Sequence, residues 1–141
     1  MNQLDEIGRL ISGSRQLYEQ WTKARGINYN TLAVLYGVLH YPDCTQKNIC
    51  ENWGLPKQTV FSVCRQLAQQ GRLKFAPDPN DKRGKTLHLT EDGLAFAQPI
   101  IDQIRTVETA VIGAFGEQEM TELIRQLQRF TDIVARHTQE P

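Results

Sequence analysis

The chain has 141 residues, of which 40% are hydrophobic and 23% charged, so it is long enough for one compact domain with an ordinary core. It contains no apolar run near the length of a membrane span, and its N-terminal sequence MNQLDEIGRL lacks the basic start and apolar core of a signal peptide. Three cysteines, an odd number, argue against a disulfide framework. We therefore expect a cytoplasmic protein with no membrane partner.

The charged residues are unevenly distributed, although the formal net charge of the whole chain is zero. Residues 1–55 hold five basic and five acidic side chains, residues 56–89 hold seven and two (net +5), and residues 90–141 hold four and nine (net −5). A basic patch on one face supplies the salt-sensitive attraction that binds phosphates, while an acidic remainder is repelled by nucleic acid. A solvated surface segment is the common alternative for such a charge run.

The spacing of apolar residues predicts three helices before the basic segment. The first extends from about Gln3 to Lys23 and carries an apolar stripe of heptad-like spacing, which needs a partner helix. The second covers 31–39 and begins at a cap formed by Asn28 or Asn30. The third covers 46–53 and is short. A short helix, a tight turn and another helix is the order of a helix-turn-helix motif.

A fourth helix is predicted from Pro56, whose fixed φ suits the first helical position, to Gly71, whose conformational freedom suits a left-handed cap. Its apolar residues recur every three or four positions: Val60, Val63, Cys64 and Leu67. The remaining positions carry hydrogen-bonding side chains suited to base edges and phosphates: Lys57, Gln58, Thr59, Ser62 and Arg65. We expect this helix to be the one that reads DNA.

A charged β-hairpin is predicted directly after that helix. A first strand covers 72–76, a second includes Leu87 and Leu89, and the intervening 77–84 is rich in turn residues. Three cations then project from the tip of a loop: Lys82, Arg83 and Lys85. Such a loop can place a guanidinium in a narrow minor groove, with a neighbouring carboxylate fixing its direction.

The hairpin resembles the wing of the MarR family of bacterial transcriptional regulators, in which D-x-x-D-[RK]-R is followed by a strand and L-T-x-x-G. The matching residues, in order, are Asp78, Asp81, Lys82, Arg83, Leu87, Leu89, Thr90 and Gly93. The chain length and the helices on either side also agree with that family. The resemblance implies a homodimer that binds double-stranded DNA and is released from it by a small aromatic effector.

Two long apolar stripes follow the hairpin, from Ala97 to Val111 and from Met120 to Val134, and both exceed what a small DNA-binding part can cover. The predicted fold is therefore mainly α with a small β-hairpin wing, a single domain over 1–141. Residues 28–93 form the winged helix-turn-helix, here called the reading head. The flanking 1–25 and 94–141 are dimerisation helices, so two reading heads would lie on a pseudo-palindromic site.

The resemblance also assigns roles to individual residues. The family places a minor-groove arginine in the wing, which implies that Asp81 orients Arg83 and leaves Lys82 and Lys85 to contact phosphates. The effector cleft of the family lies between the dimerisation helices and the reading head. This implies a pocket near Tyr18, Tyr36 and His40, for which packing between helices is an equally strong interpretation.

Other functions have weaker support in the sequence. We find no nucleophile motif, phosphate-binding glycine loop or paired His and carboxylate, so no enzyme and no cofactor is predicted. His40, Cys44 and Cys50 match no strong metal-ligand spacing, and no metal site is expected. Two alternatives stay open. One is a winged-helix module that binds protein rather than DNA, and the other is a redox sensor that uses Cys44 or Cys50.

Overall fold

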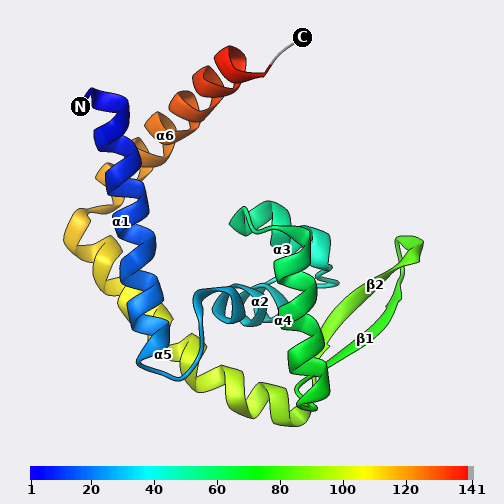
Figure 1. The fold of residues 1–141 in the computed structure, drawn as a ribbon. Coiled ribbons are helices and arrows are strands. Elements are labelled where there is room, and N and C mark those ends of the chain that lie inside the picture. Colours follow the sequence, from blue (N-terminus) through cyan, green and yellow to red (C-terminus); the bar gives the residue numbers. More distant parts are fainter. Residues whose placement is uncertain (140–141) are drawn as a thin grey trace. The chain divides into compact units, whose positions relative to one another are not determined.

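A computed structural model describes residues 1–139 and shows six α-helices and one two-stranded antiparallel sheet in that range (Figure 1). The elements, in chain order, are α1 (Gln3–Lys23), α2 (Tyr29–His40), α3 (Gln46–Trp53), α4 (Lys57–Gln69), β1 (Leu73–Asp78), β2 (Asp81–Leu89), α5 (Glu91–Phe115) and α6 (Glu117–Thr138). The predicted winged helix-turn-helix fold with flanking helices is confirmed. No helix in residues 1–139 combines the length and hydropathy needed to cross a membrane.

The first three helices begin at side-chain caps. Asn28, not the alternative Asn30, caps α2, because its Oδ1 accepts a hydrogen bond of 2.8 Å from the amide of Thr31. Thr45 caps α3 in a reciprocal capping box with Asn48. These bonds satisfy amides that have no partner inside the helix. Two of the helices, α1 and α3, have the predicted bounds, whereas α2 is longer than predicted at both ends.

The start of α4 differs by one residue from the prediction. Pro56 is the N-cap and not the first helical residue, since its ψ of 145° is extended. Its ring still fixes φ at −61° immediately before the helix. At the other end, Gly71 has a φ of +74° and accommodates the left-handed turn that was predicted there.

The hairpin is longer than the sequence pattern suggested. The prediction that three cations project from a loop tip is wrong for Lys85, which lies within the ladder of β2 opposite Pro77. The turn itself consists of Pro79 and Asn80, since Asp78 pairs with Asp81. Residues 82–84 have no partners in that register and form a bulge beside the turn. Both strands therefore extend into the range 77–84, which the sequence pattern predicted to be a loop.

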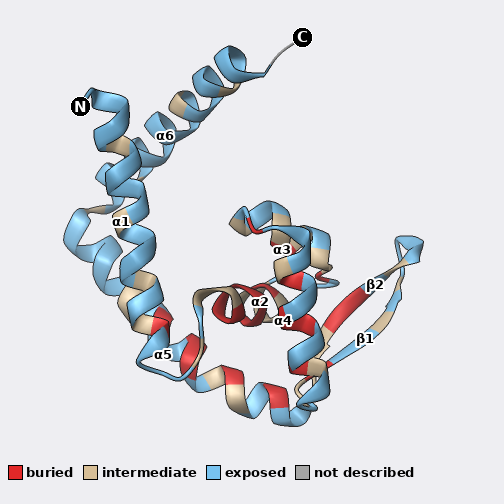
Figure 2. Cartoon of the chain, in the orientation of Figure 1, coloured by how far each residue is buried: buried red, intermediate tan, exposed pale blue. Residues whose placement is uncertain are grey.

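The core lies among α2, α3, α4, the base of the hairpin and the first part of α5, as the buried residues in Figure 2 show. Its large, fully buried apolar side chains include Leu35, Ile49, Leu87, Ile101, Val34 and Val60. The apolar residues that were predicted to face inward from α4 are all buried. The hairpin is fixed to this core by a hydrogen bond of 2.8 Å from the amide of Leu87 to the carbonyl of Cys44.

The base of the wing is joined to α4 and α5 by the L-T-x-x-G motif. The Thr90 hydroxyl donates to the carbonyl of Gly71 at 2.6 Å and accepts from the amide of Gly93 at 3.0 Å. The amide of Thr90 donates to the carbonyl of Arg72. A side chain on Gly93 would collide with that same carbonyl, so the close approach requires glycine at this position.

Backbone contacts divide the chain into two compact units, Met1–Ile101 and Asp102–Pro141. The helix α5 continues through Pro99 and contributes to both. In the first unit, α1 contacts α2, with the Arg15 guanidinium 4.8 Å from the ring centre of Tyr29. In the second unit, no residue of α6 is buried in the single chain. The helix is nevertheless amphipathic, with its apolar and polar side chains on opposite faces.

Candidate nucleic-acid interface

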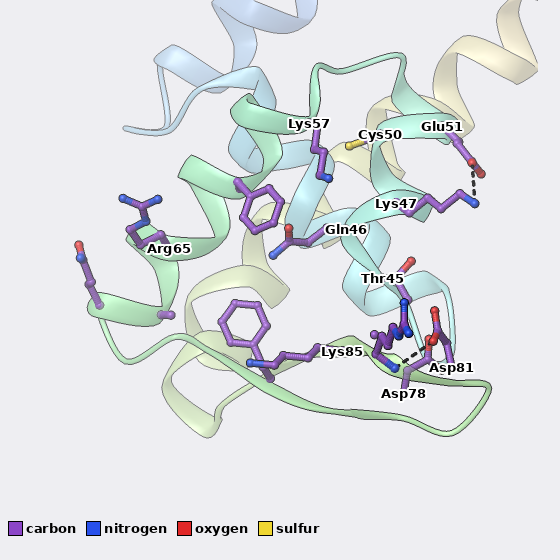
Figure 3. Close-up of a pocket in the computed structure, with 16 residues that line it drawn as sticks. Thr45, Gln46, Lys47, Cys50, Glu51, Lys57, Arg65, Asp78, Asp81 and Lys85 are labelled. Atoms are coloured by element: carbon purple, nitrogen blue, oxygen red, sulfur yellow. Dashed lines mark hydrogen bonds and ion pairs between the residues drawn. The ribbon is translucent and has the colours of Figure 1, made fainter.

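A concave surface lies between α3, α4 and the hairpin and encloses a volume of about 1170 Å³ (Figure 3). Its lining residues are Thr45, Gln46, Lys47, Cys50, Glu51, Lys57, Phe61, Arg65, Ala68, Gln69, Phe75, Asp78, Asp81, Arg83, Gly84 and Lys85. We call it the concave surface below. It joins the helix and the hairpin that were identified separately from sequence.

The predicted residues of α4 divide between two parts of its exposed face. Lys57 and Arg65 line the concave surface, together with Lys85 and Arg83 from the hairpin. Gln58 and Ser62 are exposed outside that lining, and Thr59 is half-buried. The helix therefore presents cations toward the wing and neutral hydrogen-bonding side chains elsewhere on its outer face.

The two hairpin aspartates hold the turn through backbone amides. Asp78 Oδ1 accepts from the amide of Asn80, and Asp81 Oδ1 accepts from the amide of Arg83, each at 2.9 Å. The second bond directs the Arg83 backbone rather than its guanidinium. Both Arg83 and Lys82 are exposed. Carboxylates in these positions shape a tip whose long cationic side chains extend into solvent.

Electrostatics favour an anionic occupant of the concave surface. Its lining contains five basic residues and three acidic ones. The acidic residues already have partners: Glu51 lies 3.8 Å from Lys47, and both aspartates accept the amide bonds described above. In Figure 3, Lys57 and Lys85 reach toward the hollow from α4 and the hairpin. Within residues 1–139 the other four cations form no ion pair, so they can meet phosphates without first breaking one.

Two aromatic residues of the concave surface were missed by the sequence analysis. Phe61 on α4 and Phe75 on β1 remain 45% and 39% exposed. The Nζ atoms of Lys57 and Lys85 lie 5.8 and 6.0 Å from the respective ring centres. The available signal was the helical position of Phe61, which lies about 100° around α4 from Val60 and outside the face that carries Val60, Cys64 and Leu67.

The three predicted effector residues are all half-buried. Tyr36 and His40 stack with ring centres 3.8 Å apart, and the edge of Trp53 approaches Tyr36 with centres 5.7 Å apart. His40 Nδ1 also lies 2.9 Å from the carbonyl of Tyr36. Tyr18 lies on α1. The structure thus brings Tyr36 and His40 into one aromatic cluster and adds Trp53, which the prediction omitted.

Two of the three thiols are poorly suited to reaction with oxidants. Cys44 and Cys64 are buried, and burial raises their pKa to about 11 and about 12. They are therefore protonated at neutral pH, whereas the thiolate is the reactive form. Cys50 is half-buried and lines the concave surface. In the described residues 1–139, no group of three or more His, Cys, Asp or Glu side chains is arranged to hold a metal ion.

A helix-turn-helix followed by a basic hairpin defines a winged-helix protein of the DNA-binding class. The family model described as MarR family matches residues 25–84. A solved structure of a MarR family regulator from Neisseria meningitidis, NMB1585, is 36% identical, with 97% of this chain and 96% of that chain covered and a TM-score of 0.87. The chain belongs to the MarR family of transcriptional regulators.

More distant relatives agree with this assignment. The transcriptional regulator Hpr from Geobacillus thermodenitrificans is 25% identical over 104 residues, which are 73% of this chain and 52% of that protein. The chain thus spans about half the length of such curated relatives. The MepR–DNA complex from Staphylococcus aureus contains a chain of the same fold, with 21% identity, a TM-score of 0.70, and 94% and 98% of the two chains covered.

Proposed function

We propose that this protein is a sequence-specific transcriptional regulator that binds double-stranded DNA through α4 and the wing. The observation that carries the proposal is the concave surface, in which Lys57, Arg65 and Lys85 face outward while the neighbouring carboxylates have partners within the chain. The solved complex of the related regulator MepR with DNA supports the same class of ligand.

Within α4, we assign base reading to Gln58, Thr59 and Ser62 and phosphate contact mainly to Lys57 and Arg65. A glutamine can form two hydrogen bonds to adenine, and hydroxyls can bond either a base or a phosphate. The first two turns of a recognition helix are the part that reaches base edges. A full positive charge beside the hairpin is better suited to the phosphate backbone.

Within the wing, we assign minor-groove insertion to Arg83 and phosphate contact to Lys82 and Lys85. The bond from the Arg83 amide to Asp81 holds the backbone from which the arginine side chain extends. A narrow A·T-rich minor groove has a deep negative potential that attracts a guanidinium.

We infer that the functional unit is a homodimer. The terminal helices carry large apolar side chains that the single chain leaves exposed: Leu4, Leu10, Ile11 and Leu17 on α1, and Leu123, Ile124, Leu127, Ile133 and Val134 on α6. An amphipathic helix with an exposed apolar face is stabilised when a second copy covers it. A two-fold dimer would present two recognition helices about 34–36 Å apart, one turn of DNA.

We also propose that a small aromatic effector modulates DNA binding from a site near Tyr18, Tyr36 and His40. The stacked Tyr36 and His40 offer an apolar surface with polar atoms at its edge, which is the chemistry that aromatic ligands require. Titration of salicylate-like compounds against the protein–DNA complex tests this part. If the compounds neither release the DNA nor stabilise the free protein against heat, the proposal is contradicted.

The decisive experiment is selection of bound sequences from a random pool of DNA duplexes. The proposal expects an enriched pseudo-palindrome whose half-sites are about 10 base pairs apart from centre to centre. A winged-helix module that binds only protein would enrich no sequence. A redox sensor would enrich one whose affinity depends on oxidation of Cys50, the thiol that lines the concave surface. Enrichment that is independent of oxidant contradicts that alternative.

A further inference from the structure

An exposed phenylalanine on the proposed recognition helix has no role in the core. Phe61 is 45% exposed, whereas the apolar residues at 60, 63 and 67 of the same helix are 0%, 7% and 3% exposed. A single exposed aromatic ring is not unusual on a protein surface. This ring, however, lines the concave surface that we propose to hold DNA, so binding would remove it from water.

The neighbours of Phe61 indicate what covers it. Lys57 and Arg65 lie four residues before and after it, so the three side chains form one row along α4. The Lys57 Nζ is 5.8 Å from the ring centre. All three residues line the concave surface. A ring flanked by cations one turn away on each side is complementary to a surface with an apolar spot between two phosphates.

Duplex DNA presents such an apolar spot in its major groove. The C5 methyl group of thymine projects there, and phenylalanine is one of the side chains that contact it. Cytosine lacks the methyl group, and the purines present nitrogen and oxygen atoms instead. From this geometry we propose that Phe61 is a specificity-determining residue that reads a thymine methyl group in each half-site. The inference rests on the proposed function, since it requires α4 in the major groove.

Phe75 provides a matched comparison within the same surface. It is similarly exposed, at 39%, and has a lysine nitrogen at 6.0 Å, yet it lies on β1 opposite Leu87. It belongs to the wing, which we assign to the backbone and the minor groove. The minor groove contains no thymine methyl group. Removal of the Phe75 ring should therefore leave the discrimination of thymine unchanged.

The experiment replaces the thymines of the selected duplex with uracil, one position at a time. Each replacement removes only the methyl group and preserves base pairing. Wild-type protein should lose about four-fold in affinity at one thymine of each half-site, which corresponds to one buried methyl group, and little at the others. Phe61→Ala should bind the thymine and uracil duplexes equally at that position. Phe61→Leu should retain part of the difference, and Phe75→Ala should retain all of it.

Circular dichroism melting should show that Phe61→Ala is folded, because its ring is largely outside the core. Wild-type affinity that is unaffected by uracil at every position overturns the inference while leaving DNA binding established. Equal discrimination in Phe61→Ala and Phe75→Ala also overturns it. If the wild-type protein selects no duplex, the proposed function fails as well, and that result is distinct from both.

Discussion

The reading head and the C-terminal helix contain similar apolar side chains but differ in what covers them. In α2, five apolar or small residues and one threonine are buried by neighbouring elements of the same chain. In α6, no residue is buried, and Leu127 and Ile124 remain 39% and 61% exposed. Burial of apolar surface is the main stabilising contribution in folding. The reading head thus gains it within one chain, whereas the single chain leaves the apolar residues of α6 exposed.

This difference matches the two roles that we propose for the two regions. The reading head is held by short backbone bonds such as the one from Leu87 to Cys44, which fix the wing against the start of α3. A fixed distance between helix and wing is what simultaneous contact with adjacent DNA grooves requires. The terminal helices set the distance between two reading heads only if they pair with another copy.

The largest effect that we expect comes from a substitution at the base of the wing. Gly93→Ala should lower the free energy of unfolding by about 1–3 kcal/mol, because the added methyl group collides with the carbonyl of Arg72. Thermal melting at equal protein concentrations measures the change. Gly113→Ala is the control, since an added methyl group there meets no neighbouring atom and improves helix propensity. Equal melting temperatures for the two variants would show that the close approach is not required.

A second prediction tests whether α6 depends on another copy. Leu127→Asp should convert the dimer to a monomer or an aggregate, because it introduces a charge into the proposed apolar contact. Light scattering on the full chain at micromolar concentration measures the mass. Arg129→Asp, on the exposed polar side of the same helix, should leave the dimer intact. A monomeric wild-type protein would refute the comparison between the two regions.

A third prediction sharpens the division of roles within α4. Gln58→Ala should lose about 1–3 kcal/mol of binding free energy on the selected site and relax the preference at one base pair. Arg65→Ala should weaken binding to all sequences by a similar factor, because a phosphate contact carries no sequence information. Fluorescence anisotropy on selected and scrambled duplexes distinguishes the two. Equal losses for Gln58→Ala on both duplexes would remove it from the base-reading set.

The smallest expected effects concern the tip of the wing. Arg83→Lys should still be clearly defective, because it keeps the charge but loses the planar guanidinium, while Lys82→Arg should be nearly neutral. Wild-type affinity should also depend on the A·T content flanking the half-site, and Arg83→Ala should abolish this dependence. If Lys82→Ala and Arg83→Ala lose equal affinity and both retain the A·T preference, the wing is only a diffuse basic patch.

The helices were largely predictable because their signals are local. Two helices, α1 (Gln3–Lys23) and α3 (46–53), were predicted with the correct bounds. Their signals are apolar residues spaced three or four apart and residues that end or cap the helix, all close together in the sequence. The motif residues Thr90 and Gly93 identified the wing for the same reason. Pro56 was placed one position too far into its helix, since proline fixes φ but leaves ψ free to be extended.

The concave surface was only partly predictable because it depends on contacts between distant segments. The hairpin register pairs Pro77 with Lys85 and leaves a bulge that no local pattern specifies. Phe61 was assigned neither to the apolar face of α4 nor to its DNA-reading residues. Its place in the concave surface depends on α4 and β1 lying on either side of the same hollow, which no local pattern specifies.

The central claim is that α4 and the wing bind duplex DNA specifically, and the salt dependence of affinity for the selected duplex tests it most directly. We predict a steep linear fall of the logarithm of the affinity with the logarithm of the salt concentration, with tighter binding to the selected than to a scrambled duplex. Lys85→Ala should reduce the slope by about 1. A slope near zero, with equal affinity for the two duplexes, would contradict the account.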